Sequence, residues 1–425
     1  MKIASLVAGT LALASAAAQT PAVNSAADVR PPLTVAEVTS VLGRVREHVA
    51  ANTPARMVHR ETGAEISVLP HADAALERGA FNLAAYQWGM VYAGMLAVAE
   101  ATGDAAYRDY ADTRLKFIAR TAPLYREAQA AAAQARGGAT VFRAFNHPRA
   151  LDDAGAMSMA MIKAHRAGIG GELKPLFEPL IAWIHTKQDR LADGTLTRNV
   201  PQPHTLWLDD VYMSVPALAQ AGKLTGDGKY FDDAVKQVTQ FAARLFNREK
   251  GLWFHGWVEG GTEHPELHWA RANGWVQMAL GELLDVLPEN HAQRAAVLEI
   301  YRAHVRGLAK VQSADGRWHQ LLDRPDAYRE SSATAMMVFG IARGVNRGWI
   351  EAREFAPVAI LGWRGLASQV NARGEVENVC VGTGVEFNAA FYLARPVSAV
   401  APHGPGPVFL AGAEMIALAK NLQTR

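Results

Sequence analysis

The amino-acid sequence predicts an all-α protein, a closed (α/α)6 barrel built from six helical hairpins. Three observations predict this fold: a repeat of about sixty residues, a glycine marker that returns with the repeat, and two kinds of helix that alternate along the chain. The 425 residues are 50% hydrophobic and 20% charged, which is a globular composition with ample chain to bury a large core.

The repeat shows first in a short phrase that occurs twice. The pattern Thr-Gly-Asp-x-x-Tyr begins at Thr102 and again at Thr225, an interval of two repeats. A glycine followed by a short extended segment marks the repeats, at the positions Gly63, Gly138, Gly194, Gly251, Gly316 and Gly374. Solenoid repeats are shorter, roughly 33–47 residues, so this unit favours closure into a barrel over the alternative of an open α-solenoid.

Segments that are apolar on nearly every face alternate with amphipathic ones. The apolar segments are expected to begin near Tyr86, Leu151, Leu208, Arg271, Arg329 and Gly404. A helix that is apolar all round is buried all round, so these segments are predicted to form the inner layer. Stretches such as 107–120, 231–246 and 294–312 are apolar on one side only, which is typical of an outer layer.

The N-terminus has the pattern of a secretory signal peptide. Lys2 precedes an Ala-rich apolar run that ends at Ala18, with small residues before the expected cleavage site. We therefore expect a signal peptide over 1–18, a linker over 19–32 and a single barrel domain over 33–425, in a periplasmic or secreted protein.

Charge and cysteine content exclude several classes of partner and of metal or disulfide site. The chain has 43 Lys and Arg against 41 Asp and Glu, a net charge of +2, so no nucleic-acid or membrane partner is expected. Cys380 is the single cysteine, which excludes internal disulfides, Cys-rich zinc sites and iron–sulfur clusters. We expect a small-molecule ligand and a monomer or weak homodimer.

Two Leu-Asp-Asp triplets stand where inner helices are expected to begin, one repeat apart. They contain Asp152 and Asp153, and Asp209 and Asp210. Each aspartate can simply cap its helix. Neighbouring residues on a helix point about 100° apart, so one of each pair can face the barrel centre. Two close carboxylates do not both ionise easily, and the one whose pKa rises can act as an acid near neutral pH.

Aromatic, basic and histidine residues accompany these acids. The tryptophans are either core residues or a sugar-binding wall, and they are Trp88, Trp207, Trp257, Trp269 and Trp275. Arg271 either pairs with a carboxylate or holds an anionic group of a ligand. His255 and His268 have no zinc-motif spacing, so we expect no metal and no organic cofactor.

With these motifs the sequence resembles the unsaturated uronyl hydrolases of glycoside hydrolase family 105, and their relatives of family 88. The resemblance covers about 84–418 and is most specific in Trp-Leu-Asp-Asp-Val-Tyr-Met at 207–213 and Trp-Ala-Arg-Ala-Asn-Gly-Trp at 269–275. It implies the (α/α)6 barrel. It also implies removal of a 4,5-unsaturated uronic acid from the non-reducing end of lyase-generated oligosaccharides, from rhamnogalacturonan, ulvan, glycosaminoglycan or another polysaccharide.

The resemblance also implies roles for individual residues. Asp209 protonates C4 of the enol ether and activates water for C5, and Asp152 shares a proton or hydrogen bond with it. Asp153 stands where relatives often have His, so it remains an alternative to Asp152. The substrate-contacting positions are Trp88, His255, Arg271 and Trp275, and we add His268 for its place beside them.

Two other functional hypotheses are compatible with the sequence. A helical barrel with a His or Tyr base, such as an epimerase or a polysaccharide lyase, is compatible with His255 and His268. A non-catalytic binding protein on an α-solenoid predicts an extended groove and ordinary carboxylate pKa values.

Overall fold

The computed structural model describes residues 32–126 and 141–423. From Leu33 onward the chain forms one compact unit. The signal peptide expected over 1–18 lies outside the described residues, and so does the linker expected over 19–32 except for its last residue. Both therefore stay predictions.

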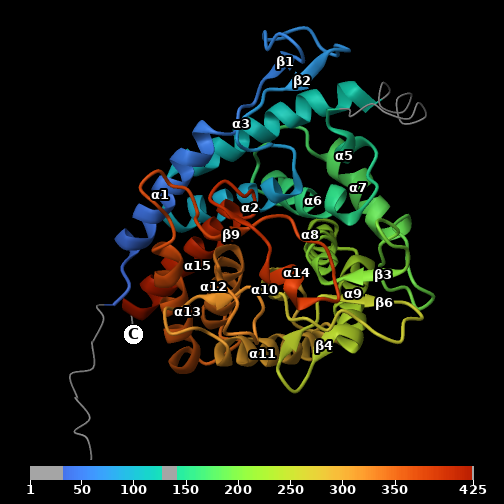
Figure 1. Cartoon of the computed structure of the whole chain (residues 1–425). Coiled ribbons are helices and arrows are strands. Elements are labelled where there is room, and N and C mark those ends of the chain that lie inside the picture. The colour runs from blue at the N-terminus through green and yellow to red at the C-terminus, as the bar shows by residue number, and fades with distance from the viewer. Residues whose placement is uncertain (1–31, 127–140, 424–425) are drawn as a thin grey trace, which may run out of the picture. The chain divides into compact units, whose positions relative to one another are not determined.

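Within the described chain, six helices stand side by side in a closed inner ring (Figure 1). Each packs on the next in chain order, and the last packs on the first as well as on its predecessor. They are α2 (Tyr86–Thr102), α6 (Leu151–Arg166), α8 (Val215–Thr225), α10 (Ala270–Val286), α12 (Ser331–Asn346) and α15 (Pro405–Gln423). The predicted barrel is confirmed, and the open solenoid is wrong because α15 closes on α2.

A second layer of helices surrounds this ring, and each inner helix packs mainly on one outer helix. Five outer helices follow their inner partner in the sequence, whereas α1 at the start of the domain packs on α15 at its end. In the part of the chain that the structure describes, they are α1 (Val35–Ala51), α3 (Ala105–Thr121), α7 (Lys174–Thr186), α9 (Gly228–Leu245), α11 (Arg294–Lys310) and α13 (Ala352–Ala367).

The repeated Thr-Gly-Asp phrase is the turn from an inner to an outer helix. Gly103 ends α2 in the left-handed region at φ 77°, and Asp104 accepts the N–H of Ala106 to begin α3. Gly226 and Asp227 do the same between α8 and α9. The glycine supplies the positive φ that ends one helix, and the aspartate accepts a hydrogen bond from a backbone N–H in the first turn of the next. This six-residue pattern therefore specifies one helical hairpin.

The glycine marker is a turn pressed against an outer helix. Gly194, Gly251, Gly316 and Gly374 all have positive φ. A Cβ on Gly316 would lie 2.1 Å from the carbonyl oxygen of Leu361 in α13, so no other residue fits there. Gly138 of the same series lies outside the described residues.

Short strands form antiparallel pairs in the connections between the helices. Their pairings among the described residues are β1 (Met57–His59) with β2 (Ala74–Leu76), β3 (Thr205–Trp207) with β6 (Gly256–Val258), β4 (Phe246–Asn247) with β5 (Leu252–Trp253), β7 (Trp318–His319) with β8 (Arg329–Glu330), and β9 (Val379–Cys380) with β10 (Val397–Ser398). The short helical segments are η1 (Ala122–Tyr125), α5 (Arg143–Asn146), η2 (Leu208–Val211) and α14 (Ala389–Leu393).

Two inner helices begin later than the sequence predicted. The segment expected to start near Leu208 opens with the 3-10 turn η2, and α8 follows at Val215. The segment expected near Arg329 starts at Ser331, because Glu330 caps α12 by accepting the N–H of Ala333. No helix of the described ranges is long and apolar enough to cross a membrane.

Candidate active site

The polar residues singled out in the sequence gather at one end of the ring, where the inner helices begin. Asp152 lies in the first turn of α6 and Asp209 in η2 before α8. Their side chains are 29% and 15% exposed, whereas Asp210 is fully buried. We call this end of the barrel the mouth.

Arg198, from the loop between α7 and β3, is the central cation of the mouth. Its Nη2 lies 2.9 Å from Oδ2 of Asp152, and its Nε and Nη2 donate to both oxygens of Asp210 at 2.9 and 2.7 Å. The guanidinium also lies 4.3 Å from the ring centre of Trp207. One arginine thus holds the Asp152 and Asp210 carboxylates in fixed positions around Asp209.

The environment pushes the pKa values of these acids apart. Burial raises the pKa of Asp152, and the negative charge of Asp209 adds to the rise against the opposing effect of Arg198. Burial likewise raises the pKa of Asp210 to about 7, although Arg198 opposes it. Burial also acts to raise the pKa of Asp209, but the hydrogen bond that it accepts from His255 and the positive charge of Arg198 outweigh that effect and lower it.

The resemblance implies that Asp209 donates a proton to C4, a role that requires the raised pKa of the pair, whereas the pKa of Asp209 is lowered. Against the opposing effect of burial, the main cause of the lowering is His255, whose Nε2 lies 3.1 Å from Oδ2 of Asp209. The raised pKa belongs to Asp152 instead, so the ionised and the protonated member of the pair exchange places.

His255 connects Asp209 to a tyrosine that the sequence analysis missed. Its Nδ1 lies 2.6 Å from the hydroxyl of Tyr392 in α14, and that hydroxyl accepts the backbone N–H of Glu386 at 2.9 Å. We assign the Tyr392 O–H as donor to Nδ1 and Nε2–H as donor to Asp209, because an ionised carboxylate only accepts. A directional chain therefore ends on the Asp209 carboxylate.

Asp153, the alternative second carboxylate, is occupied elsewhere. Both of its oxygens accept from Arg143 at 2.8 Å, and Oδ2 also accepts the backbone N–H of Arg149 at 2.8 Å. Asp152 instead shares Arg198 with the mouth. The geometry selects Asp152 as the partner of Asp209.

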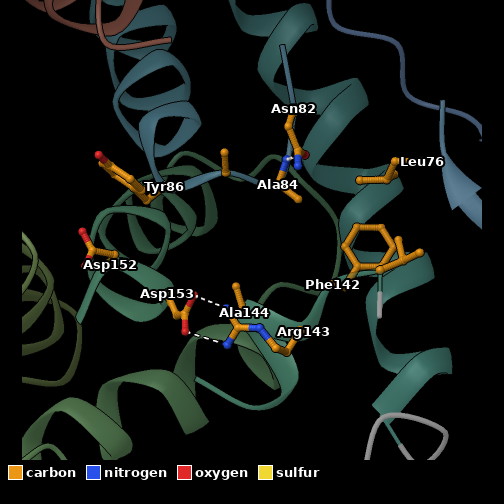
Figure 2. A pocket seen from close by; sticks show the side chains of 11 residues that line it. Leu76, Asn82, Ala84, Tyr86, Phe142, Arg143, Ala144, Asp152 and Asp153 are labelled. Atoms are coloured by element: carbon orange, nitrogen blue, oxygen red, sulfur yellow. Dashed lines mark hydrogen bonds and ion pairs between the residues drawn. The ribbon is translucent and has the colours of Figure 1, made fainter. Parts of the chain in front are cut away.

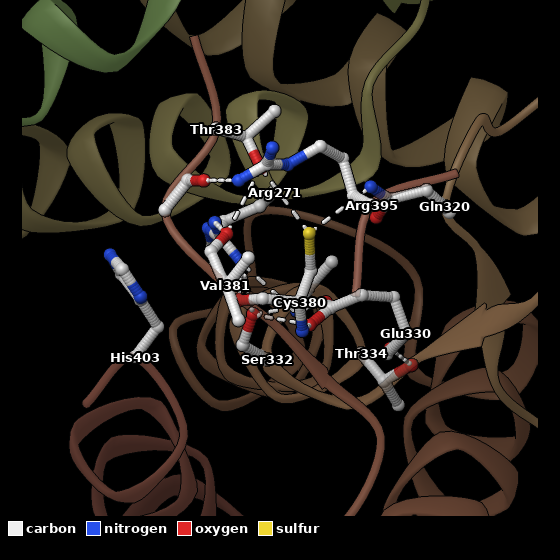
Figure 3. A network of polar contacts seen from close by, with 12 residues as sticks. Arg271, Gln320, Glu330, Ser332, Thr334, Cys380, Val381, Thr383, Arg395 and His403 are labelled. Carbon is white, nitrogen blue, oxygen red and sulfur yellow. Dashed lines mark hydrogen bonds and ion pairs between the residues drawn. The ribbon is translucent and has the colours of Figure 1, made fainter. Parts of the chain in front are cut away.

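Arg271 is a buried tie between an inner helix and a loop, as Figure 3 shows. It is 1% exposed, and its Nη1 and Nη2 donate to the backbone carbonyls of Cys380 and Val381, each at 2.7 Å. Its guanidinium lies 4.7 Å from the ring centre of Trp269. Both terminal nitrogens thus bind main chain. The carboxylate partner that the sequence suggested as one alternative is Glu330, whose Oε1 lies 3.8 Å from Nη1, whereas neither carbonyl was predicted.

Trp88 and His268 are buried against partners other than the acids, which corrects two predicted substrate contacts. The indole N–H of Trp88 donates to the hydroxyl of Tyr110 at 2.9 Å, so this side chain belongs to the core between α2 and α3. His268 stacks on Phe254 with ring centres 4.8 Å apart, and burial lowers its pKa. Neither contacts Asp209 or Asp152 among the described residues.

Tyr86 takes the place predicted for Trp88. Its hydroxyl lies 2.7 Å from Nε2 of His403, and its ring centre is 6.5 Å from that of Trp275. Burial raises the pKa of Tyr86, and the charge of Asp152 adds to the rise, so the phenol stays neutral. Trp275 also packs on Tyr212 at 4.9 Å, which makes an aromatic layer below the acids.

No three His, Cys, Asp or Glu side chains gather in a metal-binding arrangement in the ranges 32–126 and 141–423. The acids of the mouth instead have an arginine and a histidine as their polar partners.

Comparisons with known proteins agree with this architecture. The chain is 34% identical over 175 residues to an unsaturated 3S-rhamnoglycuronyl hydrolase of Alteromonas sp. (strain LOR), covering 40% of this chain and 42% of that protein. It is 25% identical over 246 residues to the unsaturated rhamnogalacturonyl hydrolase YesR of Bacillus subtilis (strain 168), covering 56% and 70%. The chain thus spans less than half the length of the first relative.

Solved structures share the fold. A possible member of family GH105 from Salmonella enterica superposes with a TM-score of 0.73 at 24% identity, covering 92% of this chain and 95% of that one. A family 105 glycoside hydrolase of C. acetobutylicum ATCC 824 gives 0.66 at 25% identity, covering 78% and 93%. The model of Glycosyl Hydrolase Family 88 matches residues 53–419. The chain therefore belongs to glycosyl hydrolase family 88, and the resemblance to family 105 read from its motifs is confirmed.

Proposed function

We propose that this protein is a hydrolase that removes a 4,5-unsaturated uronic acid from the non-reducing end of lyase-generated oligosaccharides. One observation carries the proposal: two carboxyl groups with opposite pKa shifts, Asp152 and Asp209, meet at the mouth of a family 88 barrel. Environments that push two carboxyl pKa values apart assign an acid and a base. Both relatives quoted above have names that begin with "unsaturated", which supports this substrate class.

The pKa directions divide the chemistry between the two acids. Asp152, protonated, delivers its proton to C4 of the enol ether while water adds its oxygen to C5. Asp209, ionised and oriented by His255, takes the proton of that water. The family resemblance assigned both proton donation and water activation to Asp209. We divide these two roles between Asp152 and Asp209 because the pKa values of the two residues shift in opposite directions.

The products balance. Water has been added across the double bond, which leaves a hemiketal at C5. The ring opens, C1 becomes a hemiacetal carbon, and its bond to the next sugar breaks. One proton has left Asp152 and one has reached Asp209, so exchange with solvent restores the pair. This differs from two-carboxylate hydrolysis at the anomeric carbon.

The test is a panel of lyase-generated oligosaccharides, followed by ultraviolet absorbance and mass spectrometry. We expect the absorbance of the conjugated double bond to fall and the terminal unsaturated uronate to be lost from the oligosaccharide. No change on any member of the panel would refute the proposal.

The contact between His255 and Tyr392 favours a polysaccharide lyase as the second candidate, because a lyase needs a His or Tyr base to take a proton from carbon. The same assay separates the two. A lyase makes the double bond, so absorbance would rise on an intact uronate polymer, whereas a hydrolase consumes the bond.

We also propose that the mature protein is a single barrel domain that is exported after cleavage between Ala18 and Gln19, and that works as a monomer or weak homodimer without a metal. N-terminal sequencing from the source tests the cleavage, and an intact Met1 refutes it. Chelation that abolishes activity, with rescue by a divalent ion, would refute the metal-free mechanism.

A further inference from the structure

A cavity of about 400 Å³ opens beside the proposed catalytic pair, and the hydration chemistry uses only its edge (Figure 2). It reaches the mouth through Asp152 and Tyr86, which both line it. Its other walls come from the end of β2, the segment before α2, and α5 with the residues just before it. The volume is near the lower end of small-ligand pockets, roughly 300–1,000 Å³, which suits one sugar residue better than an extended chain.

One side of the cavity is apolar. Leu76, Ala84, Val141 and Phe142 contribute to it, and Leu76 is only half-buried, so its side chain is available to a ligand. The polar side has Asn82, whose Oδ1 accepts the N–H of Ala84 at 2.9 Å. Its Nδ2 makes no hydrogen bond to the described residues and is free to donate. An apolar edge with a few polar groups is the surface that sugars bind.

The charged groups of the cavity are Asp153 and Arg143, as far as the described lining extends, since Asp152 is the protonated acid of the proposed function. Both terminal nitrogens of Arg143 are engaged by Asp153, and Nη1 also donates to the carbonyl of His147 at 3.2 Å. That ion pair is neutral as a unit. No second cation lines the cavity among residues 32–126 and 141–423.

An anionic sugar in this cavity would meet a poor environment. A sulfate or carboxylate would lose its hydration there and would find the one lining cation, Arg143, already bound to both oxygens of Asp153. An ionised group that loses water without gaining a partner is unfavourable, so such a ligand is rejected. An uncharged sugar meets no such penalty and gains the apolar edge.

We propose that this cavity holds the sugar to which the unsaturated uronate is attached, and that it selects an uncharged sugar over a sulfated or carboxylated one. The inference rests on the proposed function. It narrows the substrate class at the leaving side of the scissile bond, which the acid pair leaves open.

The experiment compares three substrates that share the unsaturated uronate: its methyl glycoside, a disaccharide with a neutral second sugar, and the same disaccharide sulfated on that sugar. For the wild-type protein we expect kcat/KM on the neutral disaccharide to exceed that on the sulfated one by at least about tenfold. Equal values, or a preference for the sulfated substrate, overturn the inference.

Leu76→Lys supplies the missing cation. It should raise the ratio of sulfated to neutral kcat/KM by roughly two- to fivefold, the size of a partly exposed ion pair. The matched control is Val68→Lys, which adds the same charge at a side chain that is 79% exposed and does not line the cavity. It should leave the ratio unchanged. Equal shifts in the two variants would show a general charge effect and overturn the inference.

Asn82→Ala tests the polar side and should lower kcat/KM for the neutral disaccharide about 2–10-fold, the effect of one lost hydrogen bond. An unchanged value overturns its assignment to the cavity. The methyl glycoside separates the two proposals. Wild-type turnover of it, with a preference for the sulfated disaccharide, overturns the inference alone. No turnover of any of the three overturns the proposed function and the inference with it.

Discussion

The two ends of the barrel both contain buried charged residues, but positive and negative side chains are equal in number at only one end. At the end opposite the mouth, which we call the base, Lys163 and Arg343 meet Glu282 and Glu414. Arg343 donates to Glu282 at 2.9 Å and to Glu414 at 2.7 Å, and Lys163 pairs with the other oxygen of Glu282. Two cations face two anions, and they tie α6, α10, α12 and α15 together.

At the mouth the carboxyl groups outnumber the arginines. Arg198 faces the three carboxyl groups of Asp152, Asp209 and Asp210. At the base burial would raise the pKa of Glu282, yet Lys163 and Arg343 outweigh it and lower the pKa. At the mouth one arginine does not suffice, so two of its acids keep raised pKa values. Buried carboxyl groups therefore stabilise the fold where cations balance their charges. Where cations are too few, some of these groups have raised pKa values and can hold a proton.

The largest test of this contrast is Asp209→Asn. The amide keeps the shape of the side chain but cannot take a proton, so we expect a rate loss of at least about 10²–10⁴-fold in a folded protein. The fall of ultraviolet absorbance measures the rate.

Asp210→Asn is its control. Asp210 is fully buried and bonded to Arg198, so its loss should lower the free energy of unfolding and cost far less in rate per folded molecule. Wild-type turnover in Asp209→Asn with a dead but stable Asp210→Asn would mean that the register of η2 is wrong by one residue.

Arg343→Leu tests the base. It leaves Glu282 and Glu414 buried without their shared cation, which should cost about 3–5 kcal/mol in the free energy of unfolding. Denaturant titration measures this, and kcat/KM per folded molecule should stay at the wild-type value. Arg347→Leu is the control at the same end: its side chain is 46% exposed and pairs with Asp285, so about 0–1 kcal/mol is expected. Equal losses would remove the distinction between the buried cluster and its surroundings.

The pH dependence of kcat/KM sharpens the contrast further. The base Asp209 must be ionised, and its pKa is lowered, so the acid limb should begin below pH 3.8. The acid Asp152 must be protonated, and its pKa is raised from 3.8, so activity should fall as pH rises through that raised pKa. The profile should therefore be bell-shaped, with its maximum between the two pKa values and a tenfold loss per pH unit beyond each. An acid limb that begins above pH 3.8, or activity that does not fall on the alkaline side, would contradict the division of roles.

The fold was predictable because its signals are local. A glycine with positive φ and a capping aspartate specify the turns after α2 and after α8 within a few residues, as Gly103 and Asp104 do in the first of them. Six helical hairpins of similar length leave few ways to bury every apolar helix. The pairing of α1 with α15 was not predictable in this way, because it joins the two ends of the domain.

The site was only half predictable, for two physical reasons. An inner helix that is apolar all round carries no periodic signal of which face meets the cavity, so Trp88 was chosen where Tyr86 faces the acids. Partners supplied by distant loops leave no mark either. Arg198 lies in a loop, and Tyr392 lies 137 residues from the histidine that it contacts. Acids at helix starts were visible; the residues that set their pKa values were not.

The smallest predicted effect concerns that distant tyrosine. Tyr392→Phe removes the donor to Nδ1 of His255 but keeps the ring, so His255 loses the bond that fixes its tautomer and orientation. Since the hydrogen bond of His255 lowers the pKa of Asp209, a looser histidine should let that pKa rise. We expect kcat to fall about 2–10-fold, the effect of one hydrogen bond, and the acid limb of the pH profile to move upward. Tyr212→Phe is the matched control, because the buried hydroxyl of Tyr212 has no hydrogen-bond partner among the described residues. It should move neither quantity. A Tyr392→Phe protein that loses rate with an unmoved acid limb would show that Tyr392 only supports the loop, and that the charge on Asp209 is set at the mouth by His255 and Arg198 alone.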